Sequence, residues 1–178
     1  MQPPLILKAV DFAARKHRDQ RRKDHDASPY VNHPIAVAMF IAEVGGVHTP
    51  EVLAAALLHD TVEDTETTPE ELETEFGATV RRLVEEVTDD KNLSQLDRKQ
   101  HQIEHAATIS EGAVLIKLGD KISNVLDVTS APPKGWDLQR RREYLDWAER
   151  VIANCRPVNT ALEQKFLAVL QQGRAVLV

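Results

Sequence analysis

The sequence predicts an all-α protein, a bundle of many short helices in one domain. Apolar residues recur every three or four positions, as at Leu115, Leu118, Ile122 and Val125, which is the spacing of one helix face. No stretch alternates apolar and polar residues over the length of a strand, and no repeat or low-complexity linker divides the 178 residues. We therefore expect a single domain over residues 1–178.

Prolines and glycines mark the ends of the first predicted helices. The first helix covers residues 5–23, apolar at its start and strongly basic at its end, and a turn-rich loop at 24–32 follows. Pro34 fits the first turn of a helix that runs to Val44, where Gly45-Gly46 end it. The next predicted helix covers residues 50–60 and starts with a proline.

A helix cap and apolar spacing predict the later helices. Thr68 is expected to cap a helix that begins at Pro69, with Glu71 completing a capping box and Gly77 ending the helix. A further loop is expected at 132–135, where two prolines and a glycine cluster. The remaining predicted helices cover residues 80–87, 97–107, 113–128, 136–154 and 157–171.

Composition and charge exclude some classes of protein. Apolar residues make up 42% of the chain and aromatic residues only 4%, so the core must be mainly aliphatic. The net charge of −6 argues against a broad nucleic-acid surface, which needs clustered positive charge. A local basic pocket for a small anion stays compatible with this charge.

The sequence also favours a cytoplasmic location. The single cysteine, Cys155, excludes an intrachain disulfide and fits a reducing compartment. No apolar run approaches the roughly 20 residues of a membrane span, and the N-terminus lacks the pattern of a secretory signal. We expect no membrane and no nucleic-acid partner.

The most apolar predicted helix ends in His59 and Asp60. Residues 52–58 are apolar on every side, which predicts a buried helix, and buried charge is costly unless it is paired or binds a metal. Glu63 and Asp64 follow one turn later, so all four groups share a face if the helix continues. A divalent cation would relieve the repulsion among the carboxylates. The alternative is a helix end that surfaces as a solvated acidic cap.

Two other segments carry candidate ligands. His33 precedes a proline-started helix and can aim a ring nitrogen inward, although a lone histidine here also fits a cap or a surface residue. Lys117, Asp120 and Asn124 share one face of the 113–128 helix, opposite its apolar face. On their own, these three residues fit an ordinary solvated face.

A basic segment lies just upstream of these candidates. Residues 15–23 hold six Arg or Lys against one Asp. Arg offers a planar fork suited to phosphate, and Lys adds a point charge. A solubilising helix face explains part of this cluster, so we single out Arg22 and Lys23, which are nearest the loop that leads to His33.

Taken in order, His33, His59-Asp60 and Asp120 resemble the H…HD…D signature of the HD phosphohydrolase superfamily. Longer segments resemble the hydrolase domain of the RelA/SpoT family, and most of all the small stand-alone alarmone hydrolases, metazoan SpoT homologues included. The resemblance runs through nearly the whole chain and leaves no sequence for a synthetase domain. The segments that carry it are Arg21 to Asp24, Pro29 to Pro34, Ala55 to Thr65, Phe76-Gly77 and Val87 to Lys91.

The resemblance implies a helical HD domain around one divalent metal ion, usually manganese. Two imidazoles and two carboxylates suit several divalent ions, so the donor types alone do not select one. Glu63 and Asp64 match the pair that orients and activates the attacking water. The implied metal ligands are His33, His59, Asp60 and Asp120. The implied substrate contacts are Arg22, Lys23, Tyr30, Asn124, Trp136, Arg140 and Tyr144.

The expected reaction is hydrolysis of the 3′-pyrophosphate of (p)ppGpp to GDP or GTP and pyrophosphate. One alternative is an HD phosphohydrolase for another nucleotide, such as ppApp or the 2′-phosphate of NADPH. Another is a non-catalytic alarmone-binding regulator, against which the intact Glu63-Asp64 pair argues. For Trp136 and Tyr144, plain core packing is an alternative to substrate contact. The sequence leaves a homo-oligomer open.

Three positions depart from the family pattern around the last ligand. Gly119 stands where alanine is common, Ser123 where an aromatic residue or an imidazole is common, and Leu126 where arginine is common. These changes leave the proposed ligands intact. They bear on the base preference and on the fit of the substrate.

Overall fold

The computed structural model describes residues 4–178, and these residues form an all-α fold, which confirms the predicted fold class. Within this range there is no β-strand, only an isolated antiparallel bridge between Arg21 and Pro29. The helical elements are α1 Leu5–Lys16, α2 Asn32–Met39, the π-helical η1 Phe40–Val44, α3 Pro50–Leu58, α4 Thr61–Asp64, α5 Pro69–Phe76, α6 Ala78–Val87, α7 Gln95–His105, α8 Glu111–Ser130, α9 Leu138–Asn154 and α10 Thr160–Val176.

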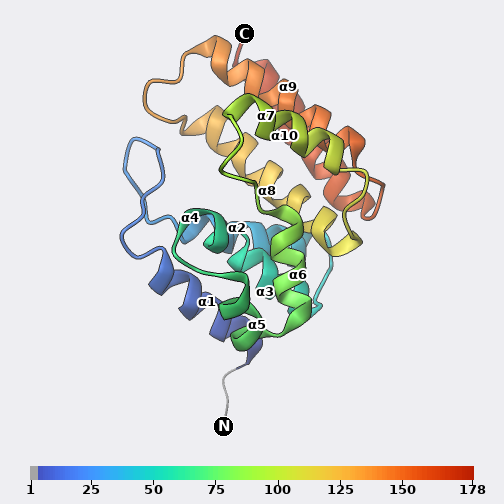
Figure 1. Ribbon diagram of the computed structural model, residues 1–178. Helices are drawn as coiled ribbons and strands as arrows, with labels where there is room; N and C mark the ends of the chain where they lie inside the picture. Colours follow the sequence, from blue (N-terminus) through green and yellow to red (C-terminus); the bar gives the residue numbers. More distant parts are fainter. Residues whose placement is uncertain (1–3) are drawn as a thin grey trace.

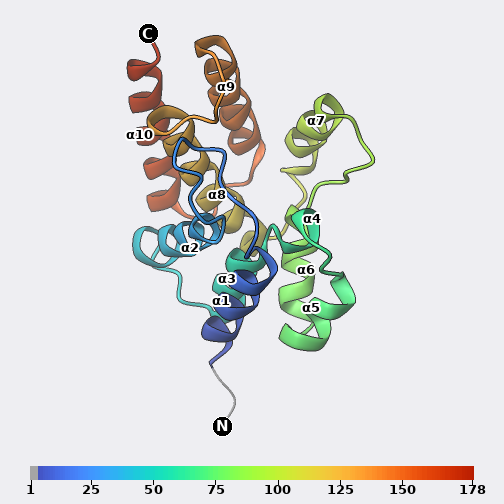
Figure 2. The same ribbon diagram turned by 90° about the vertical axis from the view of Figure 1, so that its left-hand side faces the viewer.

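The 20-residue helix α8 runs through the middle of the bundle (Figure 1). It packs against α2, α3 and α6 from the first half of the chain, and against α9 and α10 from the second half. Around this centre, α1 packs on α3, α5 on α6, and α7 on α9, and Figure 2 shows α7 standing beside the bundle near the α8–α9 end. Side chains from both halves of the chain can therefore meet along α8.

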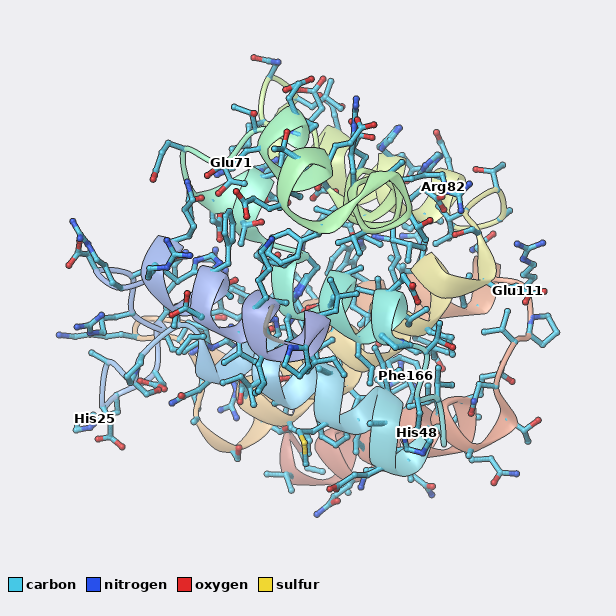
Figure 3. All side chains as sticks on the ribbon, turned by 90° about the horizontal axis from the view of Figure 1, so that it is seen from below. His25, His48, Glu71, Arg82, Glu111 and Phe166 are labelled. Carbon is cyan, nitrogen blue, oxygen red and sulfur yellow. The ribbon has the colours of Figure 1, made fainter. Side chains whose placement is uncertain are left out.

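The core is mainly aliphatic, as the composition predicts, with a few aromatic contacts. Phe12 of α1 packs edge-on against Phe76 of α5, with ring centroids 5.2 Å apart. Phe166 of α10 is buried inside the bundle, whereas His25 in the loop between α1 and α2 points into solvent (Figure 3). Burying each large apolar side chain contributes about 1.5–3 kcal/mol, so the core fixes the helix ends that carry the polar residues.

Helix α1 is shorter than predicted, because the chain turns away after Lys16. The predicted helix is wrong over residues 17–23, which belong to a loop. In that loop the Arg22 N–H donates to the Ser28 carbonyl (2.8 Å) and the Tyr30 N–H donates to the Gln20 carbonyl (3.1 Å). Like charges at helical spacing disfavour a continued helix, and the loop closes on itself instead.

The predicted helix over 50–60 is also divided. It ends at Leu58, and Asp60 has φ −98° and ψ −3° where α4 begins. The Thr61 hydroxyl donates to the Leu58 carbonyl (2.7 Å), so a side chain takes up a carbonyl that a continued helix would use. Glu63 and Asp64 therefore lie on a separate helical turn rather than on the same continuous helix as His59.

The predicted cap at Thr68 is confirmed, but only half of the capping box forms. The Thr68 hydroxyl accepts from the Glu71 N–H (3.2 Å), whereas the Glu71 carboxylate pairs with Lys16 (3.0 Å) instead of returning to Thr68. Gly77 ends α5 with φ +86°, a conformation that favours glycine. The other predicted helices are present with shifted ends. Over residues 4–178, no helix has the length and apolar character that crossing a membrane requires.

Candidate metal centre and active site

Four side chains from three parts of the chain converge beside α8. His33 comes from the first turn of α2, His59 and Asp60 from the junction of α3 and α4, and Asp120 from α8. The donor atoms of His33, His59 and Asp60 all lie within 4.8 Å of one another. The Asp120 Oδ1 atom lies 3.2 Å from His33 Nε2 and 3.8 Å from His59 Nε2. The structure thus brings together all four residues that the sequence singled out as ligands.

The hydrogen bonds of the two imidazoles leave their Nε2 atoms facing this cluster. His59 Nδ1 donates to the Ala56 carbonyl (2.8 Å), and His33 Nδ1 lies 3.1 Å from the Ser123 hydroxyl. The His59 Nε2 atom is buried and forms no hydrogen bond with any residue of 4–178, although Asp60 Oδ2 is 3.1 Å away. A buried nitrogen whose only near neighbours are carboxylate oxygens is what a metal ligand presents.

The carboxylates of Asp60 and Asp120 are held in the charged form. Burial opposes ionisation of Asp60, but His59 and His33 outweigh this effect and hold the pKa of Asp60 below its usual range. For Asp120, burial likewise opposes ionisation, and Lys121 and His33 together lower its pKa well below the ordinary value. Lys121 Nζ lies 2.9 Å from Asp120 Oδ2. Both carboxylates are therefore ready to act as anionic ligands.

The donor set fits a divalent metal ion. Metal–ligand bonds of about 2.1 Å place neighbouring donor atoms about 3–3.5 Å apart, close to the separations between the imidazole nitrogens and the carboxylate oxygens here. Further polar groups hold the ligands in place, because Tyr30 donates its hydroxyl hydrogen to Asp60 and Asn124 Nδ2 donates to Asp120 Oδ1 (2.6 Å). Two imidazoles and two carboxylates converging at one point suit a divalent metal at this position.

Glu63 and Asp64 line the same pocket of about 220 Å³ as the four ligands, despite the break between α3 and α4. Glu63 Oε2 accepts the Asp89 N–H (3.2 Å), and burial, with help from the charge of Asp89, raises the pKa of Glu63 to about 7. Asp64 is more exposed and is tied to Gln20 (3.0 Å) and Lys91 (3.1 Å). Glu63 therefore has the pKa of a group that can exchange a proton near neutral pH.

A second pocket, of about 350 Å³, opens next to the first. Arg22 extends into this pocket from the α1–α2 loop and pairs with Asp127 of α8. Its guanidinium lies 5.6 Å from the centre of the Tyr30 ring. Asn124 lines both pockets, and its Oδ1 atom accepts a hydrogen bond from the Arg22 guanidinium (3.3 Å). The sequence-predicted residues that line this pocket are Arg22, Lys23, Tyr30, Asn124, Trp136 and Tyr144.

The remaining predicted contacts differ in their positions. Lys23 is exposed, and its carbonyl accepts the Lys134 N–H (3.0 Å), which fastens the α1–α2 loop to the loop before α9. Arg140 lies over the Trp136 ring (4.5 Å) and lines a wider groove of about 720 Å³ between α7 and α9. Trp136 and Tyr144 pack on the edge of the core and also line the pockets. Core packing and a position for substrate contact therefore both describe part of their environment.

Several residues around the site were not assigned a role from the sequence. Lys117, expected on a solvated face, is only 5% exposed and lines the ligand pocket. Ser123, noted only as a departure from the family, lies at hydrogen-bond distance from His33. Asp89 and Gln102 also line the pocket. The only sequence signal for these last two was the family-like segment Val87 to Lys91, which contains Asp89 but gave it no function.

Comparisons with known proteins agree with this geometry. The HD domain family matches residues 9–146. The human guanosine-3′,5′-bis(diphosphate) 3′-pyrophosphohydrolase MESH1 is 52% identical over 167 residues, covering 94% of this chain and 93% of that protein. MESH1 of Danio rerio is 51% identical over 162 residues, covering 91% and 90%. The solved structure of a metazoan orthologue of SpoT that hydrolyses ppGpp has a TM-score of 0.93 at 44% identity, covering 99% of this chain and 98% of that one.

The HD domain family matches most of the chain, and the relatives are about half identical to it over nearly their whole lengths. These matches assign the chain to a family. The chain belongs to the HD-domain family and, within it, to the group that contains the MESH1 proteins.

Proposed function

We propose that this protein is a metal-dependent 3′-pyrophosphohydrolase of (p)ppGpp. The observation that carries the proposal is the convergence of His33, His59, Asp60 and Asp120 beside Glu63 and Asp64, in a chain about half identical to enzymes named for that reaction. The adjoining pocket supplies the basic and aromatic groups that a nucleotide needs.

The four ligands would hold one divalent ion, most simply manganese. The unpartnered His59 Nε2 and the two ionised carboxylates support this assignment. When bound, such an ion lowers the pKa of water and polarises a phosphate oxygen. The residues that surround the ligands fix their orientation, as Tyr30 does for Asp60 and Ser123 for His33.

Glu63 is the proposed proton acceptor. Its pKa of about 7 lets it take a proton from the attacking water near neutral pH, and Asp64, held by Gln20 and Lys91, positions that water. The water oxygen bonds to the phosphorus that is attached to the ribose 3′-oxygen, and the bond from that phosphorus to the 3′-oxygen breaks. The 3′-oxygen takes up a proton, so the products are GDP, or GTP, and pyrophosphate.

The substrate contacts follow from the adjoining pocket. Arg22 and Lys23 offer positive charge to phosphates, and Asn124 offers an amide between the two pockets. Trp136 and Tyr144, with ring centroids 5.8 Å apart, present aromatic surface for the base or the ribose. Arg140, stacked on Trp136, and Tyr30, bonded to Asp60, complete the proposed set. A cytoplasmic location and a single functional domain over residues 1–178 remain part of the proposal.

A substrate panel tests this assignment against the other nucleotides. The purified protein with manganese would be given ppGpp, ppApp and NADPH at equal concentrations, and phosphate and pyrophosphate release would be measured. The proposal predicts pyrophosphate from ppGpp at the highest kcat/KM. Faster release from ppApp or NADPH would mean that the same metal centre acts mainly on that nucleotide. Binding of ppGpp without release from any nucleotide would favour a regulator.

A further inference from the structure

Lys117 is a buried lysine that the proposed chemistry does not use. It lies on α8, is 5% exposed, and forms no hydrogen bond or ion pair within residues 4–178. Burial, followed by the charge of Lys121, lowers the pKa of Lys117. The ammonium nitrogen is not among the fully buried polar atoms that lack a partner, although the side chain as a whole is buried, so the charged end of Lys117 opens onto the ligand pocket that it lines. A lysine with a buried stem and an ammonium group at a pocket wall is placed to meet an anion in that pocket.

The position of Lys117 defines which ligand it meets. It lines the pocket of the metal ligands but not the adjoining nucleotide pocket that Arg22 and Trp136 line. Asp89 and Gln102 share this placement. Lys117 therefore borders the ligand pocket without bordering the nucleotide pocket.

The charges around Lys117 leave donors available there. Arg98 of α7 has a buried Nε atom with no hydrogen-bond partner in the described chain, and its NH1 atom lies 3.9 Å from Glu63. The two neighbouring carboxylates already have donors, since Gln102 Nε2 bonds Asp89 (2.6 Å) and the Asp89 N–H bonds Glu63. Lys121 is paired with Asp120. Lys117 is thus the cation that lines the ligand pocket with donor groups to spare, while Arg98 lines the adjoining groove and reaches the site only beside Glu63.

The shape of a 3′-pyrophosphate matches this arrangement. Its reacting phosphorus carries the ribose oxygen on one side and the distal phosphate on another. With the nucleoside in the pocket of Arg22 and Trp136 and the reacting phosphorus at the ligands, the distal phosphate lies toward Lys117. We propose that Lys117, assisted by Arg98, binds the distal phosphate and so makes the site prefer a pyrophosphate ester over a phosphate ester. This inference rests on the proposed function.

The test measures binding of the inorganic anions instead of turnover. Pyrophosphate and phosphate would each be titrated by calorimetry into the protein with excess manganese on both sides, so that the anion does not strip the metal. The wild type should bind pyrophosphate more tightly than phosphate. Lys117→Met should weaken pyrophosphate binding about tenfold or more, since it removes a charged hydrogen bond, and should leave phosphate binding unchanged. Unchanged pyrophosphate binding in this variant, or no preference in the wild type, would overturn the inference.

Two further variants separate the possible causes. Lys165→Met, on α10 and outside all three pockets, is the matched control and should behave as the wild type. The melting temperature of Lys117→Met should be no lower than that of the wild type. If this variant does not fold, Arg98→Met replaces it, at a side chain that is 30% exposed. Arg98→Met must then weaken pyrophosphate binding, and unchanged binding would overturn the inference. Hydrolysis of ppGpp by the wild type is measured separately. Its absence would reject the proposed function, while Lys117-dependent pyrophosphate binding would still uphold the subsite.

Discussion

Asp60 joins both imidazoles of the proposed metal centre to the loop between α1 and α2. Its Oδ2 atom lies 3.1 Å from His59 Nε2 and 3.8 Å from His33 Nε2, and it accepts the Tyr30 hydroxyl. A buried carboxylate is tolerated only with such partners. Asp60 thereby connects the ligands to the loop that carries Tyr30 and Arg22.

Replacing Asp60 tests the ligand assignment. Asp60→Ala should weaken manganese binding about 100-fold or more and abolish turnover, because it removes a ligand and the acceptor of Tyr30. Calorimetry measures the affinity, and circular dichroism should show the helical content unchanged. Asp146→Ala, an exposed carboxylate on α9, is the control. Manganese affinity within a few-fold of the wild type would remove Asp60 from the ligand set.

The pKa of Glu63 gives a second prediction at this scale. Burial, with the charge of Asp89, raises this pKa to about 7 without metal. A base acts in its ionised form, so kcat/KM should fall as the pH drops through the pKa of Glu63. A bound cation lowers this pKa, so with metal the decrease in kcat/KM should occur below pH 7. Glu63→Gln should lower kcat about 10²–10⁴-fold and flatten this part of the pH profile while manganese affinity stays constant. A variant that retains the wild-type profile would show that another group is the base.

At the scale of elements, the packing of α2 on α8 sets the distance between His33 and Asp120. Gly119 lies at this contact, where an added Cβ would meet the Val37 carbonyl oxygen and Val37 Cγ1 at 3.0 Å. The family-typical alanine at this position would therefore require Val37 and its helix to shift by a few tenths of an ångström. The departure noted in the sequence lies at this tight contact between α2 and α8.

Gly119→Ala tests that contact. Alanine gains about 1 kcal/mol of helix propensity over glycine, but overpacking costs about 1–3 kcal/mol. The close neighbour is a backbone oxygen, which cannot rotate away, so the overpacking should prevail and the melting temperature should fall by a few degrees. Thermal unfolding of the metal-free protein measures this. A higher melting temperature for the variant would mean that α2 and α8 have room to separate.

The elements also show how far the sequence could predict this fold. Apolar spacing and proline or glycine signals gave α5, α6 and α8, because those signals are local. The predicted loop at 24–32 is confirmed as far as Val31, but its earlier start at residue 17 and the break at Asp60 could not be predicted. They depend on hydrogen bonds between side chains and backbone, such as the one from Thr61 to Leu58, that a periodic pattern does not contain.

For the site, the ordered motif predicted which residues would meet but not what surrounds them. His33, His59, Asp60 and Asp120 are brought together, and Glu63 shares their pocket. Lys117 looked like part of a solvated face because the sequence does not show that α8 is the central helix, packed against α2, α3, α6, α9 and α10. The burial of Lys117 depends on the tertiary packing.

At the scale of the whole molecule, the metal centre joins segments from across the chain. Its proposed ligands come from α2, from the α3–α4 junction and from α8, and α8 itself contacts α9 and α10. A ligand that binds only the folded state stabilises it by RT ln(1 + [L]/Kd). Metal binding should therefore stabilise the entire bundle.

Metal removal tests this link. At a manganese concentration of 100 times Kd the gain is about 2.7 kcal/mol, so a chelator should lower the melting temperature by about 5–10 °C. Burial lowers the pKa of His59, but Asp60 and Asp120 outweigh it and raise the pKa to about 9 in the metal-free protein. Metal must displace this proton, so manganese affinity should increase as the pH rises toward 9. A melting temperature insensitive to chelator, or an affinity that falls with rising pH, would contradict this account.

The most direct measurement is pyrophosphate release from ppGpp by the purified protein, with and without manganese. The Glu63→Ala/Asp64→Ala double variant, which keeps all four ligands, serves as the control. We expect manganese-dependent release of one pyrophosphate per GDP formed, and none from the double variant. No release from ppGpp by the manganese-loaded wild type, or equal release by the double variant, would contradict the proposed reaction or its catalytic pair.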